Sequence, residues 1–99
     1  MHTETAGSDE PRPRFPFGQI VSTPNALASI PEAEMIRALA RHLSGDWGEL
    51  DSHDRNANER ALRTGGRLFS EYRSDGGAKF WIITEADRSV TTILLPEDY

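Results

Sequence analysis

Hydrophobic and polar residues alternate most regularly in the C-terminal third of the chain, where three runs predict three strands. The runs are RLFSEYR (67–73), KFWIITE (79–85) and SVTTILLP (89–96). Asp-Gly and Gly-Gly pairs in residues 74–78 supply the positive φ values of a tight hairpin between the first two. Because residues 80–83 are apolar on both faces, the middle run is expected at the centre of an antiparallel meander.

The N-terminal half predicts one strand and two helices. FGQIVST (17–23) favours a strand that Pro24 ends. SIPEAEMIRALARHLSG (29–45) predicts a helix with Ser29 and Glu32 as a capping box and Gly45 as its stop. Its apolar stripe is expected at Ile36, Leu39 and Leu43, widened by Met35.

A second helix is predicted over residues 52–64, with Asp51 or Ser52 as N-cap and Gly65 as its stop. Residues 1–14 are polar and contain two prolines, so they are predicted to be a disordered tail before a single domain at 15–99. The expected fold is α+β, in the order β-α-α-β-β-β. It consists of a mainly antiparallel sheet of about four strands with two helices packed on one face. The direction of the first strand and the edge it joins stay open.

Composition narrows the function classes. The 99 residues contain no cysteine, which excludes disulfides and thiolate zinc sites. The apolar runs are too short to span a bilayer and residues 1–10 lack the apolar core of a signal peptide, so a cytoplasmic location is expected. The formal net charge of -5 disfavours binding to a phosphate backbone.

Five metal-capable side chains lie between residues 42 and 54: His42, Asp46, Asp51, His53 and Asp54. Helix capping explains the aspartates, and His42 is explained as a cation in the last turn of the first predicted helix. No metal, cofactor or catalytic residue is therefore predicted. A small metal-dependent hydrolase that uses this cluster stays an alternative.

Arginines concentrate in residues 55–73, and Arg60, Arg63 and Arg67 would share one side of a helix that reached residue 67. Acidic residues interrupt the stripe, so the simple explanation is that these arginines form the solvent-exposed surface of a helix with a thin apolar face. An acidic-partner surface or a weak DNA-binding regulator is the alternative. These three arginines are candidate partner-binding residues.

Trp47 and the turn at residues 85–88 are the other candidate partner-binding residues. Trp47 lies between glycine-bearing turns and either plugs the core or acts as an exposed aromatic anchor. Glu85, Asp87 and Arg88 form a charged tip between two strands, where a turn or a binding edge is expected.

Three phrases, SGDWGELDSHDRNANERAL, GGRLFSEYRS and WIITEADRSVTTILLPEDY, resemble small plasmid-related proteins carried on plasmids and integrated elements of bacteria. Some of these carry the label type I restriction modification subunit, although this chain lacks the Gly-rich cofactor turn of a methyltransferase. The resemblance implies a cargo protein of a mobile element that binds a protein partner. The expected function is a small non-enzymatic protein-binding module, with an accessory or anti-defence role as one possibility. The oligomeric state stays open.

Overall fold

The computed structural model describes residues 12–99, so most of the predicted tail at 1–14 lies outside the described residues. The observed elements are β1 (Gln19–Ser22), α1 (Pro24–Ser29), α2 (Glu32–Leu43), α3 (Ser52–Thr64), β2 (Leu68–Arg73), β3 (Lys79–Thr84), β4 (Val90–Leu94) and the 3-10 turn η2 (Pro96–Asp98). The predicted α+β class and the order of the main elements are confirmed. The short helix α1 was not predicted.

The four strands form one sheet in the order β1-β4-β3-β2. The β2–β3 and β3–β4 pairs are antiparallel, and β3 is central, as the apolar run at residues 80–83 predicted. β1 pairs with β4 in parallel, so the sheet is mixed and the prediction of a mainly antiparallel sheet was wrong. Parallel neighbours need a long crossover connection, and the helices between β1 and β4 are part of it.

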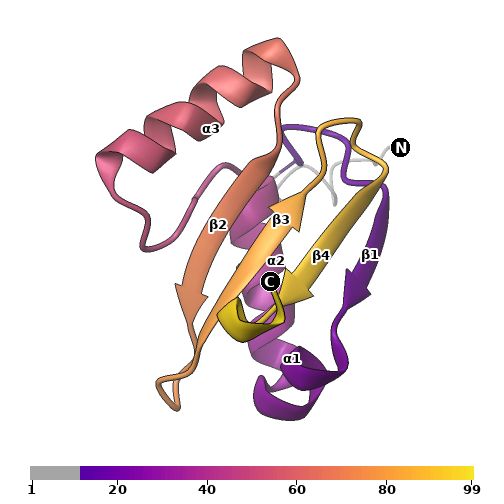
Figure 1. Ribbon diagram of the computed structural model, residues 1–99, viewed down its shortest axis with the longest axis vertical. Coiled ribbons are helices and arrows are strands. Elements are labelled where there is room, and N and C mark those ends of the chain that lie inside the picture. Colours follow the sequence, from indigo (N-terminus) through magenta and orange to yellow (C-terminus); the bar gives the residue numbers. More distant parts are fainter. Residues whose placement is uncertain (1–11) are drawn as a thin grey trace, which may run out of the picture.

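One face of the sheet is covered by helix, and the other is largely open. In Figure 1, α2 lies behind the sheet, η2 lies in front of it, and α3 lies beside the β2 edge. Helix α2 covers the centre of that face, and α3 packs at its β2 edge, where Ala61 joins a buried cluster with Leu68. The turn η2 is the described element that lies over the front face.

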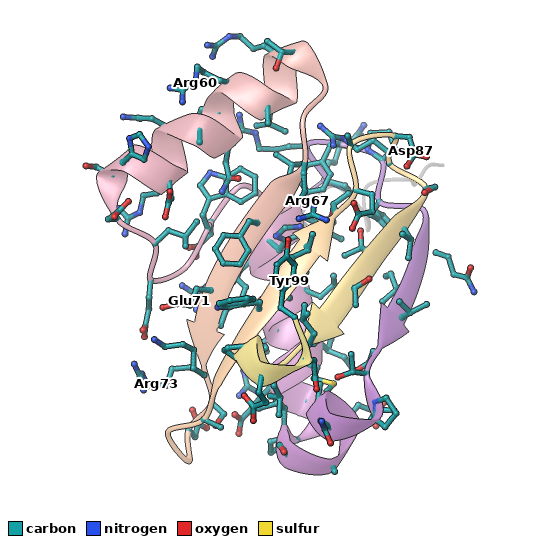
Figure 2. All side chains as sticks on the ribbon, in the orientation of Figure 1. Arg60, Arg67, Glu71, Arg73, Asp87 and Tyr99 are labelled. Carbon is teal, nitrogen blue, oxygen red and sulfur yellow. The ribbon has the colours of Figure 1, made fainter. Side chains whose placement is uncertain are left out.

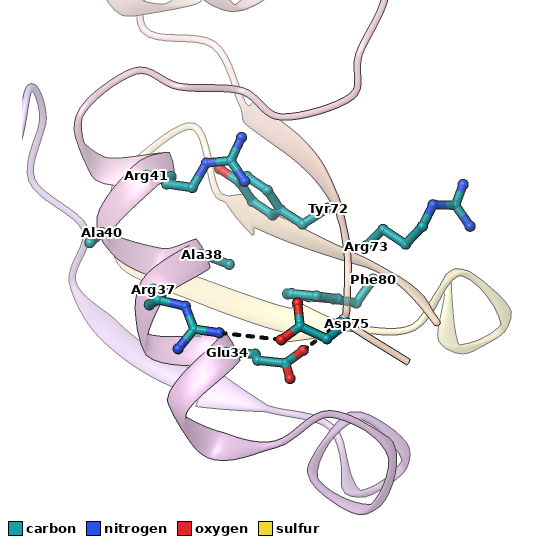
Figure 3. A pocket seen from close by; sticks show the side chains of 9 residues that line it. All are labelled: Glu34, Arg37, Ala38, Ala40, Arg41, Tyr72, Arg73, Asp75 and Phe80. Carbon is teal, nitrogen blue, oxygen red and sulfur yellow. Dashed lines mark hydrogen bonds and ion pairs between the residues drawn. The ribbon is translucent and has the colours of Figure 1, made fainter. Parts of the chain in front are cut away.

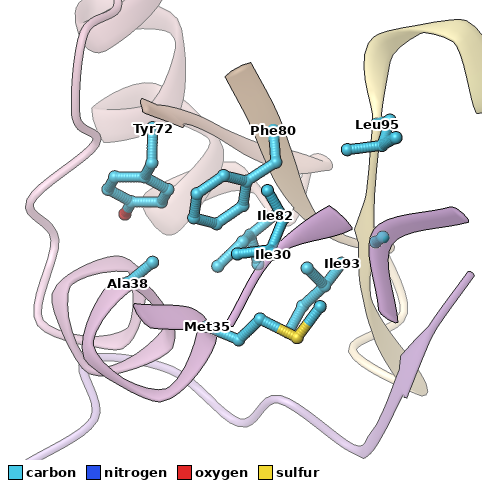
Figure 4. Packing of buried hydrophobic residues seen from close by; sticks show 9 residues of the cluster. Ile30, Met35, Ala38, Tyr72, Phe80, Ile82, Ile93 and Leu95 are labelled. Atoms are coloured by element: carbon cyan, nitrogen blue, oxygen red, sulfur yellow. The ribbon is translucent and has the colours of Figure 1, made fainter. Parts of the chain in front are cut away.

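The main core lies between α2 and the sheet (Figure 4). Its buried side chains come from both layers: Ile30, Met35, Ala38, Tyr72, Phe80, Ile82, Ile93 and Leu95. A second cluster fills the space under α3 and consists of Phe15, Trp47, Leu50, Ala61 and Leu68. Both clusters share the face of the sheet that α2 covers.

The predicted stripe of helix α2 is confirmed for Met35, Leu39 and Leu43, which contact the buried clusters, and was wrong for Ile36. Met35, Ala38 and His42 are buried, whereas Ile36 is 59% exposed. The stripe rotates because His42 points into the core, where hydrogen bonds satisfy both ring nitrogens. The predicted capping box is also absent, since Ser29 ends α1 and the N-cap of α2 is Pro31.

Helix α3 begins and ends where the sequence predicted. Asp51 accepts a hydrogen bond from the Asp54 amide at 2.9 Å, and Gly65 ends the helix with a left-handed φ of 90°. The buried Asn58 ties the helix to β2: its amide donates to the Phe69 carbonyl at 2.7 Å and accepts from the Phe69 N–H at 3.1 Å. A thin apolar face suffices because this side chain supplies the attachment.

None of the helices in residues 12–99 has the length and apolar character that crossing a bilayer requires.

Candidate functional site

Strand alternation places large apolar side chains on the open face of the sheet. Leu68, Ser70 and Tyr72 point towards α2, so the intervening Phe69 points to the opposite face. The same alternation in β3 buries Phe80 and Ile82 and leaves Trp81 half-buried on the front. The side chains of Phe69, Trp81, Ile83 and Tyr99 form what we call the aromatic face.

The three rings of the aromatic face pack edge to face around a hollow. The Phe69 and Trp81 ring centroids are 5.0 Å apart at 83°, and those of Trp81 and Tyr99 are 5.8 Å apart at 72°. The hollow has a volume of ≈ 290 Å³ and is lined by Arg67 together with the aromatic face. Figure 2 shows Tyr99 and Arg67 side by side over the sheet.

Asp98 holds Tyr99 over the sheet. The Asp98 carboxylate accepts hydrogen bonds from the Thr23 hydroxyl at 2.6 Å, the Asn25 amide at 2.7 Å and the Leu95 N–H at 3.0 Å. These donors, the Thr23 hydroxyl first, lower the pKa of Asp98. Since Thr23 also caps α1, the C-terminal turn is fixed to the start of the first helix.

Charged side chains around the aromatic face are paired within the chain. Arg67 donates to the Tyr99 hydroxyl at 2.6 Å and lies 3.3 Å from the Glu85 carboxylate. The hydrogen bond to Tyr99 is the first cause that raises the pKa of Arg67. Glu71 accepts from the Trp81 indole at 3.1 Å and pairs with Lys79 at 3.5 Å.

Two of the predicted partner-binding residues therefore lie at the rim of the aromatic face: Arg67 and Glu85. The structure brings them together although eighteen residues separate them in the sequence. Figure 2 places the labelled residues Arg60, on α3, and Asp87, at the β3–β4 turn, away from this group.

Trp47 is not an exposed anchor. Its side chain is 4% exposed, stacks on Phe15, contacts His42 edge to face, and donates its indole hydrogen to Glu59 at 3.0 Å. The prediction of Trp47 as a partner-binding residue was wrong, and the alternative that it plugs the end of the core is the observed one. The loop that contains it covers β2, where the Trp47 carbonyl accepts from the Glu71 N–H at 3.2 Å.

Arg88 turns inward and Asp87 turns outward. The Arg88 guanidinium donates to the carbonyls of Gly66 at 2.6 Å, Glu85 at 3.1 Å and Ala61 at 3.2 Å, so it links the β3–β4 turn to the end of α3. Its backbone has a positive φ of 62°. Asp87 is exposed and accepts from the Ser89 N–H at 2.9 Å, which is a turn-forming contact. Arg88 is thus a structural residue.

The predicted arginine stripe does not form. Helix α3 ends at Thr64, so Arg67 lies beyond it, while Arg60 and Arg63 stay on the exposed side of the helix. Arg63 donates to the Glu59 carbonyl of its own helix at 3.4 Å.

The five metal-capable residues are dispersed, and the described residues contain no group of three or more such side chains that could hold a metal ion. Asp46 pairs with Arg41 at 2.7 Å, and Asp51 caps α3. His42 is fully buried and lies 2.6 Å from the Ser70 hydroxyl. This distance suits a nucleophile and its base, but neither side chain is open to a substrate.

A second hollow of ≈ 410 Å³ lies between α2 and the β2–β3 hairpin (Figure 3). Its arginines are held by acids: Arg37 lies 3.9 Å from Asp75, Arg41 pairs with Asp46, and Arg73 lies 3.6 Å from Glu49. Its apolar floor is small, being formed by Ala38 and the edge of Phe80. Most of the residues that line this second hollow are charged, whereas Arg67 is the one charged residue that lines the hollow of the aromatic face. The aromatic face is therefore the stronger candidate.

Sequence reasoning missed Phe69, Trp81 and Tyr99 as site residues. The available signal was the strand run KFWIITE (79–85), which is apolar on both faces although its sheet has few helices to cover it. Tyr99 had no signal, because the turn η2 follows from contacts with Thr23 and Asn25. Comparison with known proteins gave no matching family model, no similar curated protein and no similar solved structure.

Proposed function

We propose that this chain is a non-enzymatic protein-binding module whose aromatic face receives one large apolar side chain of a partner. The observation that carries the proposal is the hollow on the open face, whose rings have their polar atoms bonded inside the chain. Trp81 donates its indole hydrogen to Glu71 and the Tyr99 hydroxyl accepts from Arg67, so the walls of the hollow are mainly ring faces. An aromatic centre within a charged rim is the usual anatomy of a binding hot spot.

The charges of the rim favour a protein over a nucleic acid. Aromatic residues on an open sheet also stack bases in RNA-binding domains, but those surfaces add an excess of positive charge for the phosphates. Here each cation near the hollow is offset: Arg67 by Glu85, Lys79 by Glu71 and Arg73 by Glu49. The net charge of -5 acts in the same direction.

The size of the hollow favours a side chain over a small-molecule ligand. Its volume of ≈ 290 Å³ lies at the lower limit of typical ligand sites, which span roughly 300–1,000 Å³. Ile83 forms a buried apolar base, and Tyr99, 72% exposed, forms one wall. A Phe, Trp or Leu side chain in an extended partner segment fits this description.

The test is selection of peptides from a random displayed library against the full chain, followed by NMR titration of the enriched peptides. We expect the enriched peptides to share one large apolar residue. The two tryptophans give an internal comparison: the indole N–H signal of Trp81 shifts on binding, while that of the buried Trp47 stays in place.

Variants then locate the site. Tyr99→Ala and Arg67→Ala are expected to weaken peptide binding about tenfold or more, the size of a hot-spot truncation. Arg60→Ala, an exposed arginine on α3, serves as the matched control for Arg67. Weaker binding by the Arg60 and Asp87→Asn variants, with Tyr99→Ala unaffected, would move the site to the α3 and turn surfaces. Salt-sensitive binding of a single-stranded oligonucleotide in place of peptides would favour the DNA-binding alternative.

The accessory or anti-defence role on a mobile element rests on the resemblance described above and stays a prediction. Affinity capture from a bacterial host that carries the gene, repeated with Tyr99→Ala, tests whether the same face binds the native partner.

A further inference from the structure

The two outer edges of the sheet differ in how residues 12–99 cover them. At the β2 edge, Asn58 bonds both backbone groups of Phe69, and the loop at residues 47–49 bonds both backbone groups of Glu71. At the other edge, β1 has β4 as its one neighbour in the sheet, and Figure 1 shows no described element on its outer side. Edge strands left in this state are templates for another strand.

The outward backbone groups of β1 belong to Ile20 and Ser22. Gln19 donates its N–H to the Ser89 carbonyl at 3.0 Å, and Thr23 donates to the Ile93 carbonyl at 3.0 Å. In a parallel pair, alternate residues face the neighbouring strand, so Gln19, Val21 and Thr23 face β4. Ile20 and Ser22 therefore direct their N–H and C=O groups away from the sheet.

The surroundings of this edge are largely apolar, with Glu32 as the charged residue among those that line the adjacent groove. β1 consists of Gln-Ile-Val-Ser and lacks the lysine, proline or bulge by which sheet edges commonly avoid pairing. Four of the five large apolar side chains exposed in the described part of the chain lie at this edge: Ile20, Val21, Leu27 and Ile36. A groove of ≈ 480 Å³ runs between β1 and the helices, with Ile20, Leu27 and Ile36 in its lining.

We propose that the chain forms a homodimer in which β1 pairs antiparallel with β1 of a second copy, about a two-fold axis between the two Val21 side chains. In this register Ile20 of each copy faces Ser22 of the other, and both pairs exchange two backbone hydrogen bonds. The result is a continuous eight-stranded sheet with both α2 layers on the same side. Leu27 and Ile36 of the two copies then close over the junction.

Self-complementarity identifies the second copy as the occupant. A shift of the register by two residues in either direction places the outward groups opposite Gly18 or Pro24, outside the strand, and loses two of the four hydrogen bonds. The four exposed apolar side chains offer on the order of 350 Å² per copy, below the roughly 800 Å² per partner of a standard interface. A weak dimer is therefore expected, with a dissociation constant of roughly 10 to 500 μM.

The charge of the chain gives the dimer a distinctive salt response. Each copy has a net charge of -5, and β1 itself carries no charge. Added salt screens repulsion between the copies, so self-association strengthens with ionic strength. A strand from an oppositely charged partner would show the reverse response.

The first experiment uses the full wild-type chain. Light scattering coupled to size exclusion measures the dimer fraction against concentration and salt, and amide hydrogen exchange is followed at low and high concentration. We expect exchange at Ile20 and Ser22 to slow about tenfold or more in the dimer, while Val21, already bonded to β4, stays unchanged. A chain that stays monomeric to about 1 mM overturns the proposal. So does protection of Ile20 and Ser22 that is independent of concentration, since another segment of the same chain would then cover the edge.

The second experiment tests the register with charges. Val21→Lys and Val21→Glu each place like charges opposite one another on the two-fold axis, so each variant alone is expected to be monomeric with a melting temperature close to the monomer value. An equimolar mixture is expected to restore a dimer that contains one copy of each, identified by native mass spectrometry. Gln19→Lys is the matched control, because its position faces Thr23 of the second copy and adds no like-charge pair.

A dimer that persists in Val21→Lys, or a mixture that fails to associate while Gln19→Lys dimerises, overturns this arrangement. The dimer leaves the aromatic face uncovered, so it does not rest on the proposed binding function. Each proposal can therefore fail without the other.

Discussion

His42 is a neutral histidine at the centre of the core, and its neighbours determine which nitrogen carries the hydrogen. Thr91 donates to the Phe17 carbonyl at 2.8 Å, so at 2.7 Å it must accept from Thr84. Thr84 then accepts from His42 Nε2–H at 3.0 Å, which leaves Nδ1 to accept from the Ser70 hydroxyl at 2.6 Å. Burial lowers the pKa of His42 to about 4.

This depressed pKa predicts an acid-sensitive fold. The unfolded chain binds a proton at His42 below about pH 6.5 and the folded chain does so only below about pH 4. The stabilisation is thus fully present above pH 6.5 and is lost as the pH falls to 4, by about 3 kcal/mol in total. Urea denaturation at intervals between pH 7 and 4.5 measures this loss. It avoids the lower range in which carboxylates such as Asp98 and Asp46 lose their own contributions.

His42→Gln serves as the control, since its amide can donate to Thr84 and accept from Ser70 without titrating. We expect this variant to be less stable at pH 7 and to have a flatter pH dependence. Parallel curves for the wild type and the variant would show that another group causes the loss.

Variants of Arg88 test whether residues 85–88 form a structural turn or a binding edge. Arg88→Gln removes charge-assisted hydrogen bonds to four carbonyls and is expected to cost about 1.5 to 3 kcal/mol, whereas Asp87→Asn is expected to change stability by less than about 0.5 kcal/mol. Arg88→Gly loses the same bonds but adopts the positive φ without strain, so it should melt above Arg88→Gln. Thermal melting of the three variants checks this order. Equal melting of Arg88→Gln and the wild type would contradict the structural role.

At the scale of elements, α3 shows how a helix with little apolar surface stays attached. Its buried residues are Asn58 and Ala61, and Asn58 substitutes for a neighbouring strand by bonding both backbone groups of Phe69. The helix therefore closes the β2 edge while most of its surface stays in contact with solvent.

Asn58→Ala is expected to lower the free energy of unfolding by about 2 to 4 kcal/mol, because it leaves a backbone donor and acceptor without partners. Exchange of the Phe69 amide hydrogen should accelerate more than that of its β3-bonded neighbours. Asn56→Ala, two residues earlier on the exposed side of the same helix, should leave both quantities unchanged. A comparable loss in Asn56→Ala would indicate that helix propensity, rather than the Phe69 contact, is being measured.

At the scale of the whole molecule, stability comes from the layer between α2 and the sheet. Ile82 on the central strand has no exposed surface, while Ile36 on α2 is largely exposed. Ile82→Ala is expected to cost about 2 to 5 kcal/mol through lost burial and cavity formation, enough to unfold much of a small domain. Chemical denaturation gives the value.

Ile36→Ala provides the matched control, because the same atoms are removed from a different place. In the monomer, Ile36→Ala is expected to change the free energy of unfolding by no more than about 0.5 kcal/mol. Similar losses at both positions would contradict the observed rotation of the α2 stripe.

Local signals in the sequence determined the boundaries of α3, the β2–β3 hairpin and the central place of β3. These features depend on contacts within a few residues, such as the Asp51 cap and its partner three residues later, or on the alternation within one strand. Two residues of the rim, Arg67 and Glu85, were also among the predicted partner-binding residues. Glu85 was predicted from its place at a turn between strands, whereas Arg67 was predicted as part of a helical stripe that does not form.

The tertiary structure decided the rest. The parallel direction of β1, the inward turn of His42 and the place of Tyr99 depend on partners far along the chain. His42 bonds Ser70, 28 residues away, and Thr23 bonds Asp98, 75 residues away. A sequence pattern records which side chains are apolar but not which distant donor or acceptor will meet them. For that reason a histidine was counted as polar surface and a tryptophan as a possible anchor, until packing placed both in the core.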